Sequence, residues 1–175
     1  MKESNVFKQI LIVAFAAFQS FGLSAMQHIP DGYDLVEYNS ALHEDGVKKI
    51  FEQNSKYLGR FKLEDDSEAM IVEKDKKVCG FISYALGYTK EKGKIHFLGV
   101  SQDYRKKGLG SCLVKFALFE LFAWGASKVC LSTIQTNKGG EVFYEKLGFK
   151  KNPPEPVYGC YRFVIEKGTE QEVEK

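Results

Sequence analysis

The chain has 175 residues, 44% of them hydrophobic and 14% aromatic, so it can fill the core of one domain and is unlike a disordered protein. Its 25 basic and 23 acidic side chains give a formal net charge of +2. This near balance excludes the strong basic excess typical of nucleic-acid-binding proteins, and we expect no nucleic-acid partner.

The first 25 residues have the pattern of a signal peptide. Lys2 and Lys8 precede the apolar stretch Ile10–Phe18, and small residues follow up to Ala25. The stretch is shorter than the roughly 20 residues that span a membrane. We expect an export signal cleaved after Ala25, which would make the protein periplasmic or secreted. The alternative is an N-terminal helix that packs on or anchors the domain of a cytoplasmic protein.

The cysteines and histidines are too scattered for a zinc site, and we expect no metal. The cysteines are Cys79, Cys112, Cys130 and Cys160, and the histidines are His28, His43 and His96. We expect the cysteines to be buried, reduced thiols.

Hydrophobic periodicity predicts strands and helices along most of the chain. The expected strands are Tyr33–Tyr38, Ala69–Glu73, Val78–Tyr88, Lys94–Val100, Lys128–Ile134 and Cys160–Glu166. The expected helices are Ala41–Asn54, Gly108–Trp124 and Gly139–Lys146, and turns are expected at Asp75–Lys77 and Lys92–Gly93. Strand Lys94–Val100 is nearly all apolar from Ile95 on, so we expect both of its faces to be buried.

The order of these elements predicts an α/β fold in one domain, residues 31–166, followed by a polar tail, residues 167–175. The strand–helix–strand unit from Lys94 to Ile134 predicts a parallel pair with a right-handed crossover. The hairpins on either side predict antiparallel pairs. The expected sheet is therefore mixed and mostly antiparallel, with helices on both faces, and a ligand should bind beyond the carboxyl ends of the parallel strands.

The loop Arg105–Gly110 joins a strand to a helix and is suited to binding a diphosphate. Gly108 and Gly110 let the backbone approach a ligand, and the first amides of the helix have no internal acceptors. Arg105, Lys106 and Lys107 add positive charge. The alternative is a solvated basic turn before a glycine-rich helix start. The patterns of the nucleoside-triphosphate P-loop and of the dinucleotide fold are both absent.

Two segments resemble motifs of the GNAT superfamily of N-acetyltransferases. Ile95–Gly110 is similar to motif A, in which an apolar strand is followed, after a five-residue step, by Arg or Gln and then xxGxG. Asn137–Phe149 is similar to motif B, in which an Asn is followed seven residues later by a Tyr, here Asn137 and Tyr144. The motifs lie in the family's order, and the resemblance covers Tyr33–Glu166.

The resemblance implies acetyl-CoA as co-substrate and a parallel strand pair that is splayed apart. The pantetheine arm would pair with the bulged motif A strand, and Gly99 suggests a bulge or a close backbone approach there. Asn137 would contact the arm or order the loop before the last helix. The residues expected to bind the coenzyme are Leu98, Gly99, Val100, Arg105, Lys106, Lys107, Gly108, Leu109, Gly110, Ser111 and Asn137.

Tyr144 resembles the family's general acid, placed near the coenzyme sulfur. A phenol has a pKa of roughly 10 and a thiol roughly 8.5, so hydrogen bonding to the developing thiolate is favoured over full proton transfer unless the site lowers the phenol pKa. The alternative is a core aromatic residue beside Phe143 and Leu147.

The general base is not evident from the resemblance. The positions where relatives carry a glutamate are Lys94 and Ser132 here. His96 has a suitable ordinary pKa, but its alternation with Phe97 leaves its direction open. A water chain or an acceptor amine of low pKa are the other candidates.

These observations predict an acetyl-CoA-dependent N-acetyltransferase of the acyltransferase class, in which an amine attacks the thioester directly in a ternary complex. The alternatives are a non-catalytic acyl-CoA-binding sensor or interaction module and, more remotely, an enzyme acting on aminoacyl-tRNA. Export would separate the protein from cytosolic acetyl-CoA. The acceptor, a small-molecule or protein amine, would be selected by Leu42–Lys62 and Pro153–Gly159, and the sequence leaves the oligomeric state open.

Overall fold

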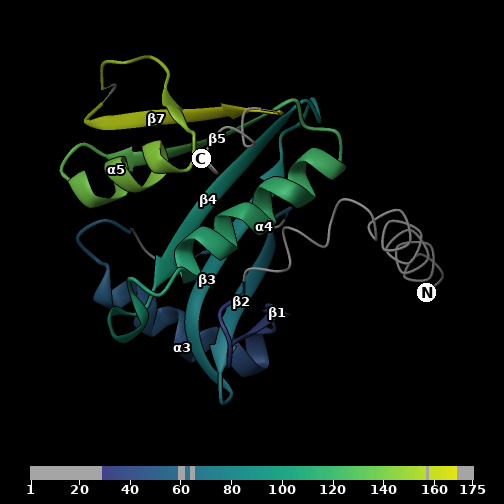
Figure 1. The fold of residues 1–175 in the computed structure, drawn as a ribbon, viewed down its shortest axis with the longest axis vertical. Coiled ribbons are helices and arrows are strands. Elements are labelled where there is room, and N and C mark those ends of the chain that lie inside the picture. The colour runs from purple at the N-terminus through teal and green to yellow at the C-terminus, as the bar shows by residue number, and fades with distance from the viewer. Residues whose placement is uncertain (1–28, 59–61, 64–65, 157, 169–175) are drawn as a thin grey trace.

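The computed structural model describes residues 29–58, 62–63, 66–156 and 158–168. The expected signal peptide and most of the polar tail lie outside these residues. Among the described helices, none is both long and apolar enough to span a membrane. The helices are α3 (Ser40–Gln53), α4 (Leu109–Ala123) and α5 (Lys138–Lys146), and a 3₁₀ turn, η1 (Gln102–Tyr104), precedes α4 (Figure 1). The strands are β1 (Asp34–Glu37), β2 (Glu68–Lys74), β3 (Lys77–Leu86), β4 (Lys92–Val100), β5 (Lys128–Ile134), β6 (Lys150–Lys151) and β7 (Cys160–Glu166).

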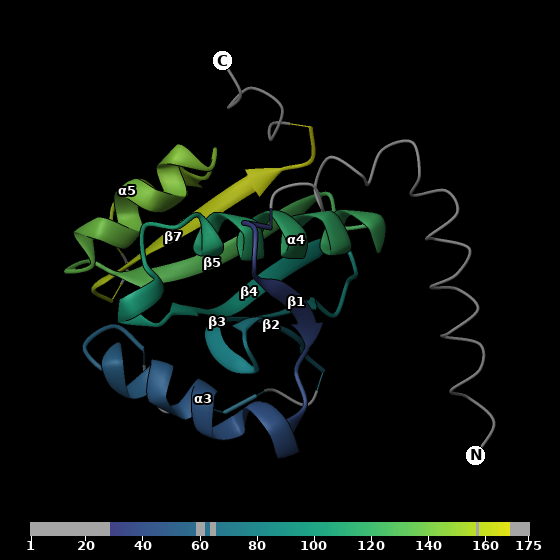
Figure 2. The same cartoon turned by 60° about the horizontal axis from the view of Figure 1, so that its bottom comes forward.

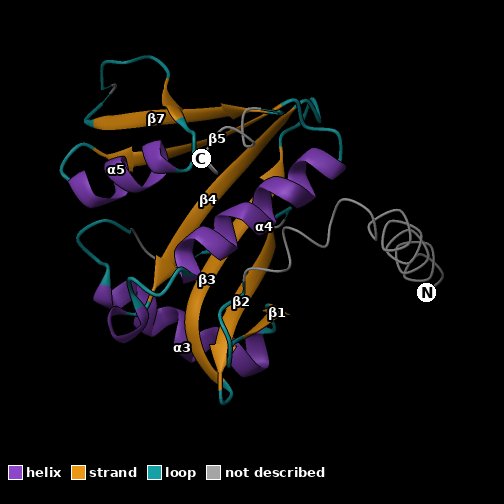
Figure 3. Cartoon of the chain, in the orientation of Figure 1, coloured by secondary structure: helices purple, strands orange, loops and turns teal. Residues whose placement is uncertain are grey.

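The strands form one sheet of seven in the order β1-β2-β3-β4-β5-β7-β6 (Figure 3). Only β4 and β5 are parallel neighbours, and every other pair is antiparallel. The expected fold class is therefore confirmed, and the predicted elements are present within a few residues of their expected ends. The short strand β6, which pairs with β7 at Lys150 and Lys151, was not predicted.

Helices cover both faces of the sheet, as expected. Figure 2 shows α4 and α5 on one face and α3 on the other. The α4 face packs a large core that includes Leu113, Leu121 and Phe163, and the α3 face packs a smaller core around Ile50 and Phe81. Strand β3 lies between these cores and is buried from Val78 to Ala85.

The turn predicted at Lys92–Gly93 is wrong. Both residues belong to β4 and pair with Lys128 and Val129 of β5. A Cβ atom on Gly93 would lie 2.8 Å from a methyl carbon of Leu121 on α4. The glycine therefore permits close packing of helix on sheet rather than a turn, and the chain reverses earlier, between β3 and β4.

The prediction that β4 is buried on both faces is also wrong. The parallel ladder between β4 and β5 ends at Lys94 and Cys130. Beyond that point the two strands diverge, as Figure 1 shows. Among the β4 residues that follow, Ile95 and Gly99 are buried, whereas His96–Leu98 and Val100 are partly exposed. The apolar sequence of this strand lines a cavity instead of filling a core.

Strand β4 carries a bulge at His96. Ser83 of β3 pairs with Phe97, and the next β3 residue, Tyr84, pairs with Ile95, so β4 has one residue in excess. Residues two apart in a regular strand face the same side of the sheet. Because of the bulge, Ile95 instead packs in the core on the α4 side and Phe97 packs in the core on the α3 side.

Of the bulge or close approach expected at Gly99, the bulge lies instead at His96, and the close approach at Gly99 is made by the Ile50 side chain. A Cβ atom there would lie 2.5 Å from Cγ2 of Ile50 on α3. The absence of a side chain at Gly99 is therefore what allows α3 to pack directly on the end of β4.

Candidate active site

The fork between β4 and β5 opens into a cavity of about 740 Å³, a size typical of small-molecule sites. One wall is β4 from Ile95 to Val100, and the facing wall is β5 from Leu131 to Ile134. The remaining walls come from the segment after α3, the loop before α4, the first turn of α4, the residues around α5 and the start of β7. They are lined by Asn54, Tyr57, Leu58, Tyr104–Lys106, Gly108–Ser111, Asn137, Gly139, Gly140, Phe143, Tyr144 and Cys160. The ligand site expected beyond the carboxyl ends of the parallel strands coincides with this fork.

The start of α4 presents backbone amides to the cavity. Gly108 caps the helix in the left-handed conformation, with φ of 81°, and offers no side-chain acceptor to the first turn. Leu109, Gly110 and Ser111 follow, and all three line the cavity. The first amides of a helix have no intrahelical acceptor and carry partial positive charge, so this end suits an anion.

The three basic residues before α4 differ in their position relative to the cavity and in their contacts. Arg105 and Lys106 line the cavity, but Lys107 does not, and its ammonium lies 5.1 Å from the ring centroid of Tyr104. Arg105 donates one hydrogen bond of 3.3 Å to the Val100 carbonyl and another of 2.7 Å to Oδ1 of Asn54. Arg105 therefore ties the end of β4 to the residue that follows α3.

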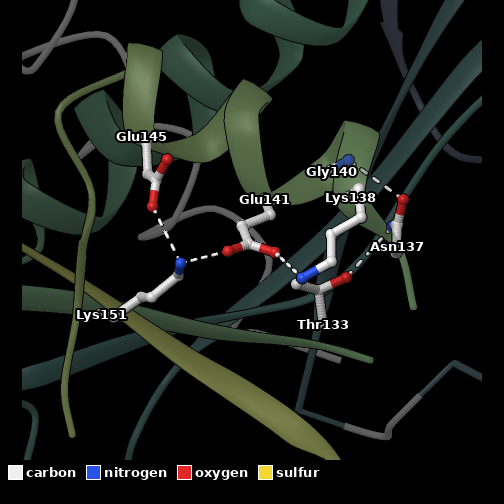
Figure 4. Close-up of polar contacts among 7 residues, drawn as sticks. All are labelled: Thr133, Asn137, Lys138, Gly140, Glu141, Glu145 and Lys151. Carbon is white, nitrogen blue, oxygen red and sulfur yellow. Dashed lines mark hydrogen bonds and ion pairs between the residues drawn. The ribbon is translucent and has the colours of Figure 1, made fainter. Parts of the chain in front are cut away.

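Asn137 caps the first turn of α5. Its Oδ1 accepts a 3.0 Å hydrogen bond from the Gly140 amide, and its Nδ2 donates a 3.1 Å hydrogen bond to Oγ1 of Thr133 on β5 (Figure 4). Of the two roles that the resemblance implied, ordering the loop before the last helix is the one seen here. Asn137 also lines the cavity, so contact with a coenzyme arm remains a prediction.

A network of ion pairs joins α5 to β6. Lys151 of β6 pairs with Glu141 and, at 3.1 Å, with Glu145, while Lys138 pairs with Glu141 at 3.1 Å (Figure 4). The hydrogen bonds from Lys151 and Lys138 hold the pKa of Glu141 below its ordinary value, and the bond to Glu141 raises the pKa of Lys151. The Lys151 ammonium also lies 4.5 Å from the ring centroid of Tyr161 on β7. These contacts fix the position of α5 against the sheet.

Tyr144 sits on α5 among aromatic rings and lines the cavity. Its ring centroid lies 5.2 Å from that of Phe143, 5.9 Å from Phe149 and 5.7 Å from Phe163. Burial raises the pKa of Tyr144 to about 12. The site thus does not lower the phenol pKa, and full proton transfer to a thiolate would be uphill by about 5 kcal/mol. Tyr144 is suited to donating a hydrogen bond to that thiolate.

The positions where GNAT relatives carry a glutamate are not acidic, and both are exposed. Lys94 lies at the last rung between β4 and β5, and Ser132 lies on β5 in the cavity wall. His96, whose direction the sequence left open, lines the cavity. Among the described residues, no group of three or more histidine, cysteine or acidic side chains could hold a metal ion.

Several cavity residues were not identified from the sequence. Asn54, Tyr57 and Leu58 follow α3, and Cys160 begins β7. The first three lie within Leu42–Lys62, the segment that we expected to select the acceptor, but the sequence did not single them out. All four cysteines are free thiols as expected, but only Cys79 and Cys112 are buried, since Cys130 and Cys160 are partly exposed.

The fold places the chain in a class of α/β proteins that have a cavity between the splayed strands of a parallel pair. A profile of the "Acetyltransferase (GNAT) family" matches residues 30–149, which is more than half of the chain. The chain therefore belongs to the GNAT family of acetyltransferases, and the resemblance seen in its sequence is confirmed.

Relatives among curated proteins match part of the chain. Mycothiol acetyltransferase of Corynebacterium glutamicum (strain R) is 33% identical over 93 residues, 53% of this chain and 32% of that protein. N-alpha-acetyltransferase 30 of Xenopus laevis is 39% identical over 61 residues, 35% of this chain and 22% of that protein. The chain thus spans a third or less of the length of these two relatives.

Solved structures share the fold at low sequence identity. Ard1 from Thermoplasma volcanium has a TM-score of 0.65 and 20% identity, covering 77% of this chain and 97% of that one. A GNAT family acetyltransferase from Elizabethkingia anophelis with acetyl-CoA bound has a TM-score of 0.56 and 16% identity, covering 78% of this chain and 99% of that one.

Proposed function

We propose that this protein is an acetyl-CoA-dependent N-acetyltransferase that moves an acetyl group to an amine by direct attack in a ternary complex. The observation that carries the proposal is the fork between β4 and β5, which opens directly onto the amide-rich start of α4. A thioester whose long arm is joined to a diphosphate has the shape and charge that such a site accommodates.

The donor would lie along β4 and end at α4. The diphosphate would accept hydrogen bonds from the amides of Leu109–Ser111, with Lys106 nearby. The pantetheine arm would pair with the backbone of Leu98–Val100, where β5 no longer pairs with β4. Backbone amides near Val100 would then stabilise the oxyanion that forms on the thioester carbonyl.

Calorimetry with acetyl-CoA tests donor binding, and Gly110→Asp is the informative variant. The new carboxylate would stand at the start of α4, where it would repel a diphosphate, and its Cβ would lie 3.4 Å from the Phe143 ring. Ser40→Asp is the matched control because it puts the same charge in the first turn of α3. We expect the first variant to weaken acetyl-CoA binding at least tenfold and the control to bind as the wild type does. No binding by wild-type protein at millimolar acetyl-CoA would refute the proposal.

A second candidate is an acyl-CoA-binding module without catalysis. Among the described residues that line the cavity, none is Asp or Glu, which favours this reading because many relatives use a glutamate. Release of coenzyme A thiol, assayed over a panel of amines, separates the two functions. The panel holds an alanine-first dipeptide, a lysine peptide blocked at its α-amine, cysteine ethyl ester, glucosamine and spermidine. Turnover on any of them excludes the binding module.

A further inference from the structure

We propose that His96 is the general base that takes the proton from the acceptor amine. This role rests on the proposed acetyl transfer and supplies a step which that proposal leaves open. An amine with the ordinary pKa of a lysine is neutral at neutral pH in only about one molecule in a thousand, so removal of its proton is a large part of the barrier.

The bulge in β4 gives His96 its position. Because His96 is the residue that β4 has in excess over β3, its side chain is released from the alternation that sends Ile95 to one core and Phe97 to the other. Bulges of this kind re-aim a side chain and are frequent beside active sites. His96 also lies two residues beyond Lys94, where the ladder with β5 ends, and it lines the cavity.

The spacing along β4 suits a base. Strand residues rise about 3.3 Å each, so His96 lies roughly 7 Å along the strand from Leu98, where the donor arm is expected. An amine nitrogen fits between an imidazole and a thioester carbonyl at that separation. A catalytic base acts at hydrogen-bond distance or through one water molecule, and both are compatible with this gap.

The other titratable groups of the wall are poorly suited to the role. They are Tyr57, Tyr104, Arg105, Lys106, Tyr144 and Cys160. The ordinary pKa values of phenols, thiols, ammonium and guanidinium groups lie above neutral pH, and burial raises that of Tyr144 to about 12. An imidazole has an ordinary pKa of roughly 6.5. Among the described residues that line the cavity, His96 carries the only imidazole, the side chain that most often serves as a general base.

The proton balance of the reaction is simple. The acceptor ammonium gives one proton to the neutral imidazole of His96, and the freed nitrogen lone pair forms the bond to the thioester carbon. The carbon–sulfur bond then breaks, its electron pair leaves on sulfur, and the thiolate receives the second nitrogen proton while Tyr144 donates a hydrogen bond to it. The His96 imidazolium finally releases its proton to solvent, so each turnover gives one amide, one thiol and one proton.

His96→Gln tests this role against Lys94→Gln, an exposed cationic residue on the same strand. Both are assayed with acetyl-CoA and the panel amine that wild-type protein acetylates fastest. We expect His96→Gln to lower kcat at neutral pH about 100-fold, the usual scale for a general base, and to abolish the acidic limb of the pH profile of kcat/KM. The calorimetric affinity for acetyl-CoA should stay unchanged, and Lys94→Gln should keep the wild-type rate and profile.

His96→Ala with added imidazole supplies the independent check, since a small base entering the vacated space should restore part of the rate. A His96→Gln enzyme that keeps its rate and acidic limb would overturn the role. So would a loss of acetyl-CoA affinity that accounts for the lost rate, or no imidazole rescue of a His96→Ala enzyme that still binds acetyl-CoA. If wild-type protein acetylates no panel amine, the proposed function fails, and the role of His96 fails with it.

Discussion

The two sides of the cavity are built differently. The donor wall consists of Leu98–Val100 and Leu109–Ser111, and we expect it to contact the donor mainly through backbone groups. Its glycines, Gly99 and Gly110, leave room for the neighbouring side chains of Ile50 and Phe143. The acceptor wall, which we assign to Asn54, Tyr57, Leu58 and Cys160, presents side chains from the segment that follows α3 and from β7. The first wall follows from a short local sequence, whereas the second is assembled from segments more than 100 residues apart in the chain.

This contrast explains why the donor is easier to assign than the acceptor. Backbone amides at a helix start suit an anion with little dependence on the surrounding side chains, so the donor wall is matched to a diphosphate. Side chains can be exchanged without loss of the fold, so the acceptor wall can suit many amines. The following predictions test where the boundary between the two walls lies.

The largest effect is expected at Tyr144, which we place at the coenzyme sulfur, between the two walls. Tyr144→Phe removes the hydroxyl and keeps the ring packing against Phe143, Phe149 and Phe163. We expect kcat to fall about 100-fold, as when one donor to a developing charge is lost, with the Kd of acetyl-CoA unchanged. Tyr88→Phe, at a fully exposed position, is the control. Equal losses in kcat and affinity would make Tyr144 a binding or packing residue.

The next effect is on stability and concerns the contact of the donor wall with α3. Gly99→Ala would put a Cβ 2.5 Å from Cγ2 of Ile50, and we expect it to lower the free energy of unfolding by about 1–3 kcal/mol in a denaturant titration. Ile50→Leu removes that branched methyl at nearly constant volume. The double variant should therefore be more stable than Gly99→Ala alone. Strictly additive losses in the two variants would disprove this contact as the cause.

A smaller effect is expected at Asn137, the cap of α5. Asn137→Ala removes the acceptor for the Gly140 amide and should lower the free energy of unfolding by about 1 kcal/mol. Asn137→Asp keeps an acceptor there, so its stability should stay near that of the wild type. If Asn137 acts only by ordering this loop through its two internal hydrogen bonds, the acetyl-CoA affinity of Asn137→Ala should change less than about threefold. A much larger loss of affinity would place Asn137 in direct contact with the coenzyme.

The smallest effect is expected in the network that holds α5 to β6. The pKa of Glu141 is lowered in the folded protein, so its contribution to stability is present above its unfolded pKa and is lost as pH falls through its folded pKa. Lys151→Met should therefore destabilise the protein at neutral pH and weaken the dependence of its stability on pH below a pH of roughly 4.5. Lys151→Arg keeps the positive charge, so it should keep both the wild-type stability at neutral pH and the wild-type dependence of stability on pH. Acid unfolding curves that coincide for wild type and Lys151→Met would exclude this contribution.

The sequence was informative where function depends on local backbone. The order of strand, glycine loop and helix predicted the loop at the start of α4, and the resemblance to the GNAT family implied that Asn137 and Tyr144 lie beside the same ligand; both line the cavity. It misled at Gly93 because a glycine required by helix packing has the same appearance as a turn glycine. It also misled for β4, since an apolar strand that lines a cavity and one that fills a core have the same composition.

Binding of acetyl-CoA to the donor wall is the central claim, and mapping of backbone amide shifts by NMR tests it most directly. Titration of wild-type protein with acetyl-CoA should move the amides of Gly99, Val100, Gly110 and Ser111 most, and Gly110→Asp should suppress these changes. The account would be contradicted by no shifts at millimolar acetyl-CoA, or by shifts that gather instead at the second cavity, of about 550 Å³, beside His43 and Glu73.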